Sequence, residues 1–178
     1  LIPVLSSLPS YPEDINITMG YPLKYTREYS FVKRLLEMQR KARTEGNTVL
    51  FEHEDIERII TDDLISGLLN DQDKQISQKI ISGNLFRVPS DLFSGSEFLS
   101  KIFSLPGSPA QLSDYLKDIL IRIISGIDEE GERSGNDSAL TRLRNEFIYR
   151  ILLSLNRLDG VASSPEIKIT VSTWTRIL

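Results

Sequence analysis

Two residues near the C-terminus have the types and spacing of one half of a metal-dependent nuclease motif. Glu166 and Lys168 match its Glu-x-Lys half, in which carboxylates hold a divalent metal and the lysine stabilises developing negative charge. The nearest upstream acid, Asp159, lies seven residues earlier, at a predicted helix end rather than on the strand of a hairpin. Because a three-residue match often arises by chance, we favour a solvated strand start and keep the nuclease as an alternative.

The rest of the sequence offers little further catalytic chemistry. His53 is the only histidine, with acids on both sides, and consecutive residues do not share a helix face, so we interpret it as a helix-entry residue. No spacing supports a Ser-His-Asp triad built on it. The chain has no cysteine, which excludes disulfides and thiolate sites, and a single histidine excludes a multi-histidine metal site. Both glycine-rich phosphate-binding motifs are missing, so we expect no cofactor in this chain itself.

Basic residues are concentrated between positions 24 and 43. Only Glu28 and Glu37 oppose them there, so we expect a helix with a basic face. Such a face can contact nucleic-acid phosphates, with salt-sensitive affinity. The alternative, which we favour, is a solvated face paired with the acids Glu57, Asp62 and Asp63 of the next helix. The basic residues are Lys24, Arg27, Lys33, Arg34, Arg40, Lys41 and Arg43. The candidates for DNA contact among them are Lys24, Arg27, Lys33 and Arg34.

Composition limits the class of protein. The chain has 178 residues, of which 40% are hydrophobic, enough for the core of one domain. Its net charge of -4 argues against an autonomous nucleic-acid binder, because such domains are usually basic. No apolar run approaches the length of a membrane span, and the N-terminus lacks the features of a signal peptide. We therefore expect no membrane partner and a cytoplasmic location.

Apolar periodicity predicts a mainly α fold: a multi-helix domain of six or seven helices with short strands near both ends. Ser90 and Ser96 are predicted N-caps of two short helical segments. Residues 49–51 form a brief strand or a loop, and residues 85–88 form a short extended piece. The longer helices are predicted over residues 27–43, 54–69, 71–81, 109–124 and 138–158, and the terminal strands over 15–18 and 167–171.

Turn and linker residues divide the chain. Residues 1–23 are a lead-in with a short strand, which belongs to a neighbouring domain or to this one. Residues 24–160 form the helical domain, and Gly, Ser and acidic residues over 126–138 predict a mobile linker inside it. Residues 161–178 form a strand and a truncated helix. Because the chain begins without Met and ends within a helical pattern, we expect a fragment of a longer protein.

Several blocks of the sequence resemble bacterial AddB/RecB-like proteins of the Bacteroidetes type, which are UvrD-like helicase–nuclease subunits with a C-terminal PD-(D/E)XK nuclease domain. The first block resembles them most specifically, and the last resembles the run that leads back toward the helicase core. The blocks are Asn-Ile-Thr-Met-Gly-Tyr-Pro-Leu at 16–23, Tyr-Ser-Phe at 29–31 with Leu-Leu-Glu-Met-Gln at 35–39, Phe-Glu-His-Glu-Asp-Ile at 51–56 with Ile-Ile at 59–60, and Ile-Thr-Val-Ser-Thr-Trp-Thr-Arg-Ile-Leu at 169–178.

The resemblance implies a non-catalytic helical accessory insertion in the second helicase-like half, without the ATP site or the nuclease site. The parent protein would use ATP and Mg, would bind DNA and a helicase–nuclease partner subunit, and would process double-strand breaks in recombinational repair. The acidic sequence pI of about 5.1 argues against strong DNA binding by this chain alone. A helical protein–protein interaction module without a DNA role is the main alternative, and the metal-dependent nuclease is the third.

Overall fold

The structure is a computed structural model, and it describes residues 22–83, 85–134 and 139–162. The predicted strands over 15–18 and 167–171, the lead-in before residue 22 and the segment 163–178 lie outside these residues. In the described part the chain is mainly helical, as predicted, with seven α-helices and one small antiparallel sheet. The two 3-10 turns are η1 (Leu23–Tyr25) and η2 (Ser90–Phe93). The α-helices are α2 (Arg27–Lys41), α3 (His53–Ile60), α4 (Asp63–Ser66), α5 (Asp71–Ile81), α6 (Glu97–Ile102), α7 (Pro109–Ser134) and α8 (Ala139–Ala162).

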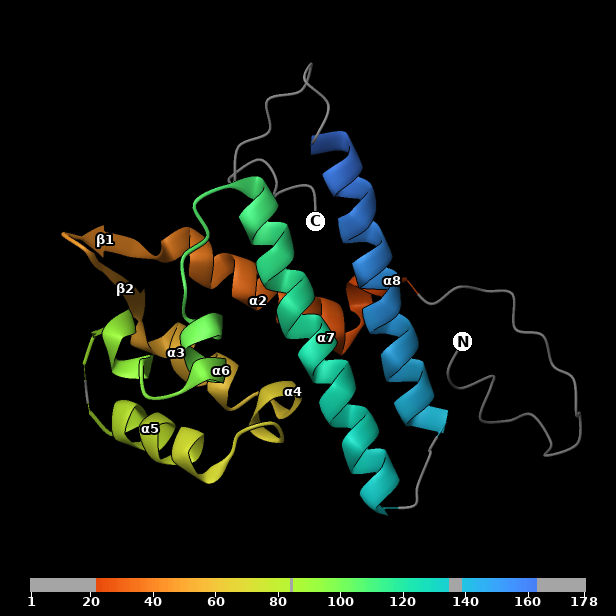
Figure 1. Ribbon diagram of the computed structural model, residues 1–178, viewed down its shortest axis with the longest axis horizontal. Coiled ribbons are helices and arrows are strands. Elements are labelled where there is room, and N and C mark those ends of the chain that lie inside the picture. The colour runs from red at the N-terminus through yellow and green to blue at the C-terminus, as the bar shows by residue number, and fades with distance from the viewer. Residues whose placement is uncertain (1–21, 84, 135–138, 163–178) are drawn as a thin grey trace, which may run out of the picture.

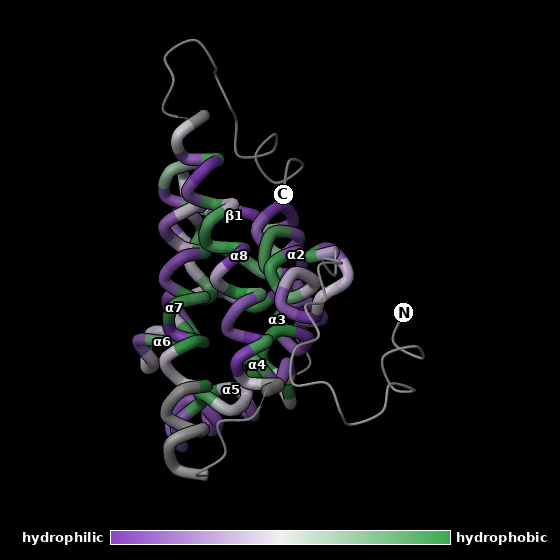
Figure 2. Tube along the Cα trace, turned by 90° about the vertical axis from the view of Figure 1, so that its right-hand side faces the viewer, coloured by the Kyte–Doolittle hydropathy of each residue, from purple (hydrophilic) through white to green (hydrophobic). Residues whose placement is uncertain are grey.

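The two long helices α7 and α8 lie side by side and run in opposite directions, while the sheet and the short helices lie on the other side of α7 (Figure 1). Helix α2 packs against both α8 and α3. Apolar and polar residues alternate along α2 and α7 in Figure 2, as expected of helices that bury one face. Three aromatic rings anchor the core beside the sheet: Phe93 stacks on Phe103 at 4.0 Å, and Phe51 meets Phe103 edge-on at 5.9 Å.

The sheet has the order β1 (Arg43–Glu45), β2 (Thr48–Glu52) and β3 (Arg87–Pro89). Gly46 has φ of 61° and, with Asn47, makes the two-residue turn of the β1–β2 hairpin. Helix α2 ends at Lys41, two residues before the predicted end at residue 43, because residues 43–45 form β1 of the hairpin. Residues 49–51 are strand, and β3 ends at Pro89, a residue that an edge strand tolerates.

A second correction concerns the predicted helix over 54–69, which the structure divides into α3 and α4. The break lies at Asp62, whose backbone is extended and whose carboxylate accepts a hydrogen bond from the Leu64 N–H at 3.0 Å. A capping aspartate offers the backbone an alternative to a continuous helix. Helix α5, by contrast, has the predicted bounds, because Asn70 and Asp73 form a reciprocal capping box at its start.

The predicted N-caps of the two short segments have different outcomes. Ser96 caps α6, because its hydroxyl accepts a hydrogen bond from the Leu99 N–H at 2.9 Å. Ser90 is the first residue of η2 rather than its cap, and the capping position is taken by Pro89, which makes no side-chain hydrogen bond.

Residues 126–134, predicted to belong to a mobile linker, instead continue α7. Ile127 is 9% exposed and adds one turn to the buried stripe of Leu116, Leu120 and Ile123, so burial offsets the low helix propensity of glycine. The remainder of the predicted linker, residues 135–138, lies between the described ranges. Helix α8 likewise continues past residue 158, where the predicted helix ends, to Ala162.

Helical spacing predicts an apolar stripe on this helix made of Leu140, Leu143, Phe147, Ile151, Leu155 and Leu158, and α8 departs from it in its N-terminal half. Ile148 is fully buried where Phe147 was predicted, and Leu143 is 48% exposed. Ile151 and Leu155 are buried as predicted. Helical spacing is sufficient to identify the buried residues in the later half of α8. The earlier half contains apolar residues at several helical positions, and only packing against α2 and α7 determines which of them are buried.

Two glycine substitutions test how closely α7 packs against Leu68 at residue 126. A Cβ at Gly126 would lie 1.9 Å from the Leu68 Cδ2, whereas a Cβ at Gly160 in α8 meets nothing within 4 Å. We expect Gly126→Ala to lower the free energy of unfolding by about 1 kcal/mol through overpacking, and Gly160→Ala to raise it by up to about 1 kcal/mol. Urea unfolding measures both, and equal stabilisation by the two variants would contradict the packing of Gly126 on Leu68.

Candidate nucleic-acid interface

Helix α2 carries most of the basic residues of the N-terminal region, and its start is fixed by Thr26. The Thr26 hydroxyl accepts a hydrogen bond from the Tyr29 N–H at 3.2 Å and donates one to the Leu23 carbonyl at 2.7 Å. The inner face of α2 is buried in the core, whereas Lys33, Glu37 and Arg40 are exposed along its outer edge. The buried apolar residues are Phe31, Val32, Leu35, Leu36 and Met38.

Three of the seven basic residues bind carboxylates. Arg34 pairs with Asp62, whose side chain is only 3% exposed, and Arg27 pairs with the more exposed Asp63. The pairing predicted with these two aspartates is therefore observed. Lys41 lies 3.0 Å from Asp55 and 3.2 Å from Glu52. These pairs tie α2 to α3, β2 and the start of α4, so they hold the helix in place.

The four predicted contact residues thus fall into two groups. Arg27 and Arg34 are engaged with aspartates, whereas Lys24 and Lys33 are exposed and form no ion pair with any described residue. The Lys24 ammonium lies 4.9 Å from the ring centroid of the exposed Tyr25, within the range of a cation–π contact.

Arg40 and Arg43 are two further exposed cations that were absent from the predicted contact set. Neither forms an ion pair within the described ranges. Arg40 follows Lys33 by seven residues, which places the two on one edge of α2. Arg43 begins β1, two residues after the helix ends. Helical spacing from the buried stripe would have identified Arg40, whereas Arg43 depends on the end of α2 at Lys41.

Hydrogen bonds to carboxylates raise the pKa of two of the paired cations. The hydrogen bond to Asp63 raises the pKa of Arg27, and the hydrogen bond to Asp55 raises the pKa of Lys41. A raised folded-state pKa gives stability that is fully present below the unfolded value, about 10.4 for lysine. That stability is lost as the pH rises through the folded pKa. The stability that these two cations contribute is therefore fully present at neutral pH.

The other residues considered for catalysis have structural partners or lie outside the described ranges. His53 is the first residue of α3, as predicted, and its Nε2 lies 3.3 Å and 3.2 Å from the carbonyls of Ile80 and Ile81 at the end of α5. Asp159 of α8 binds Lys117 and the buried Ser113 of α7. Glu166 and Lys168 lie beyond residue 162, the last that the structure describes.

Two kinds of feature are absent from the described residues. Within the described ranges, no group of three or more His, Cys, Asp or Glu side chains is placed to hold a metal ion. None of the helices in the described part of the chain combines the length and the apolar character that crossing a bilayer requires.

Two adjacent aspartates provide a matched test of the pairing. Asp62 is buried and also caps α4, whereas Asp63 is exposed. We expect Asp62→Ala to lower the free energy of unfolding by about 2 kcal/mol, because it removes a cap and leaves Arg34 without its partner. Asp63→Ala should cost less than about 1 kcal/mol. Chemical denaturation of both variants checks this, and equal losses would contradict a structural role for Asp62.

Comparisons of this chain with protein-family models, with curated proteins and with solved structures found no match.

Proposed function

We propose that this chain is a non-catalytic helical accessory domain of an ATP-dependent DNA helicase–exonuclease that processes double-strand breaks. The support is the resemblance of residues 16–23 and of the blocks around 29–39, 51–60 and 169–178 to AddB/RecB-like proteins. In this proposal ATP and Mg are bound elsewhere in the parent protein, and this domain contributes shape and a weak contact with DNA. Its partners are DNA, through the parent protein, and a helicase–nuclease partner subunit.

The observation that carries the DNA contact is the separation of paired from unpaired cations on α2. Lys33 and Arg40 project from its outer edge without a carboxylate partner among the described residues. Seven residues of helix span about 10 Å, which is close to three base-pair steps of about 3.4 Å along the axis of duplex DNA. Arg43, two residues beyond the end of α2, is a further exposed cation on β1. We therefore propose Lys33, Arg40 and Arg43, with Lys24 at the start of the helix, as the phosphate contacts.

The net charge of -4 sets the expected strength of this contact. The acidic remainder of the molecule repels a polyanion, so four cations give only weak binding by the chain alone. In a larger protein the same cations add to contacts made elsewhere, because linked weak contacts raise the overall affinity. The proposed role is therefore to guide DNA rather than to capture it.

Charge reversal on α2 tests the DNA contact. We expect the full chain to bind short single-stranded or duplex DNA at low salt, and Lys33→Glu with Arg40→Glu to weaken binding roughly tenfold and to reduce the salt slope by roughly 1 to 2. Fluorescence anisotropy at two salt concentrations measures this. The matched control is Lys74→Glu with Lys79→Glu on α5, two exposed lysines without an ion pair within the described ranges. Equal weakening by both double variants would reject α2 as the contact surface.

The nuclease alternative has a separate test. Under our proposal, the chain incubated with Mg²⁺ or Mn²⁺ leaves linear DNA intact, and Glu166→Ala changes nothing. The physical reason is that a lone Glu-x-Lys lacks the second carboxylate that metal-dependent cleavage needs, and the nearest upstream acid, Asp159, is held by Lys117. Gel analysis of end-labelled DNA reads the result, and metal-dependent cleavage that Glu166→Ala abolishes would establish the alternative.

A further inference from the structure

A groove of about 960 Å³ runs along α7, on the side that faces α5 and α6. One wall is α7 between residues 111 and 125, and the other is formed by residues 68–73, 95–101 and 104–106. None of the residues that line it comes from α2, so the groove is separate from the proposed DNA contact. A wall of this length measures about 21 Å, which matches a helix of about four turns.

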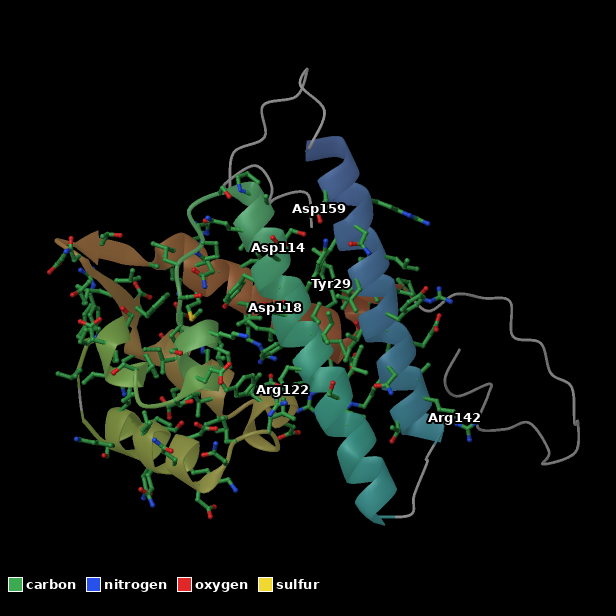
Figure 3. All side chains as sticks on the ribbon, viewed as in Figure 1. Tyr29, Asp114, Asp118, Arg122, Arg142 and Asp159 are labelled. Atoms are coloured by element: carbon green, nitrogen blue, oxygen red, sulfur yellow. The ribbon has the colours of Figure 1, made fainter. Side chains whose placement is uncertain are left out.

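The α7 wall carries three charged side chains on successive turns. Asp114, Asp118 and Arg122 are spaced by four residues and lie one below another along α7 (Figure 3). All three are exposed, and none has an ion-pair partner in the part of the chain that the structure describes. The wall is therefore negative at the end nearer the start of α7 and positive at the other end.

The remaining charges of the groove are already compensated. On the opposite wall Glu97 and Lys101 lie 4.0 Å apart on consecutive turns of α6. Asp73 is buried and accepts a hydrogen bond from the Asn70 N–H as part of the α5 capping box. The unbalanced charges are therefore the three on α7, and they determine which partner the groove fits.

Apolar side chains also line the groove and leave apolar surface exposed beside these charges. Ile121 is 54% exposed and Leu105 is 38% exposed, and both line the groove. The floor includes Tyr115, whose hydroxyl donates a hydrogen bond to the Ile102 carbonyl at 2.7 Å and which is nearly buried. Burial of exposed apolar surface drives association, and a groove of this kind receives the apolar face of an amphipathic helix.

We infer that this groove docks an amphipathic helical segment of a protein partner, with basic residues facing Asp114 and Asp118 and an acidic residue facing Arg122. Two uncompensated carboxylates oppose nucleic acid in the same place, because they repel phosphates. The partner segment is thus defined by its chemistry: apolar on one face, and basic at the end that meets the start of α7. This inference goes beyond the DNA contact and adds a second surface to the domain.

A designed peptide of about 14 residues, matched to the groove length, tests the inference. The probe is a fluorescein-labelled amphipathic helix of Leu and Lys with one Glu near one end, and a Leu and Glu peptide of the same pattern is its counterpart. We expect the full chain to bind the first peptide and not the second. Asp114→Lys with Asp118→Lys should weaken binding roughly tenfold.

The matched control for this double variant is Glu37→Lys with Glu57→Lys. Both residues are exposed acids outside the groove and without an ion pair among the described residues, and the change in net charge is the same. We expect the control to weaken peptide binding less than about twofold. Equal weakening by the two double variants would overturn the inference, because it would assign binding to the overall charge.

Three further measurements distinguish a helical partner segment in the groove from a second copy of the chain and from nucleic acid. Ile121→Ser should weaken peptide binding roughly threefold through lost apolar contact, and no change would reject a helix seated in the groove. Self-association in sedimentation that Asp114→Lys with Asp118→Lys abolishes would assign the groove to a second copy and overturn the inference. Binding of single-stranded DNA that Arg122→Glu abolishes, with peptide binding unchanged, would assign it to nucleic acid and also overturn it.

Discussion

Burial of two apolar stripes in one core, one on α2 and one on α7, determines where the charged residues of this protein lie. Phe31 and Leu35 on α2 and Leu116 and Ile123 on α7 are all fully buried. Each helix can rotate very little without exposing such residues, because a full stripe contributes several kcal/mol of transfer free energy. The outer edge of α2 and the groove side of α7 are therefore set by packing, and their charges are displayed as a consequence.

The charged residues divide into those that hold elements together and those that face solvent alone. Asp62 has both a backbone and a side-chain partner, because it caps α4 and binds Arg34. Most exposed pairs, such as Arg58 with Glu54, contribute little stability in water. The distinction matters for function, since an arginine already held by a buried aspartate is a poor phosphate ligand, whereas an unpaired lysine on an exposed edge keeps its full charge for a partner.

The two proposed surfaces have opposite electrostatic character. The edge of α2 that carries Lys33 and Arg40, with Glu37 between them, has a net positive charge, whereas the upper groove wall that carries Asp114 and Asp118 is acidic. A domain with both can contact a polyanion on one surface and a basic protein segment on another. Under the proposed function, the two surfaces would serve one domain of a larger protein, and the net charge of -4 is consistent with a DNA contact that depends on the rest of that protein.

The sequence by itself determined the mainly helical class, the bounds of α5 and the N-cap of α6, because capping residues and helical periodicity act within a few turns of chain. Tertiary structure decided the rest. Asp62 divides α3 from α4 while it binds Arg34, 28 residues earlier in the chain. Ile127 and Leu68 keep Gly126 within α7, and β3 pairs with a strand of a distant hairpin. The groove exists only where α7 passes α5 and α6, so local pattern could not reveal it: its walls come from segments that packing alone brings together.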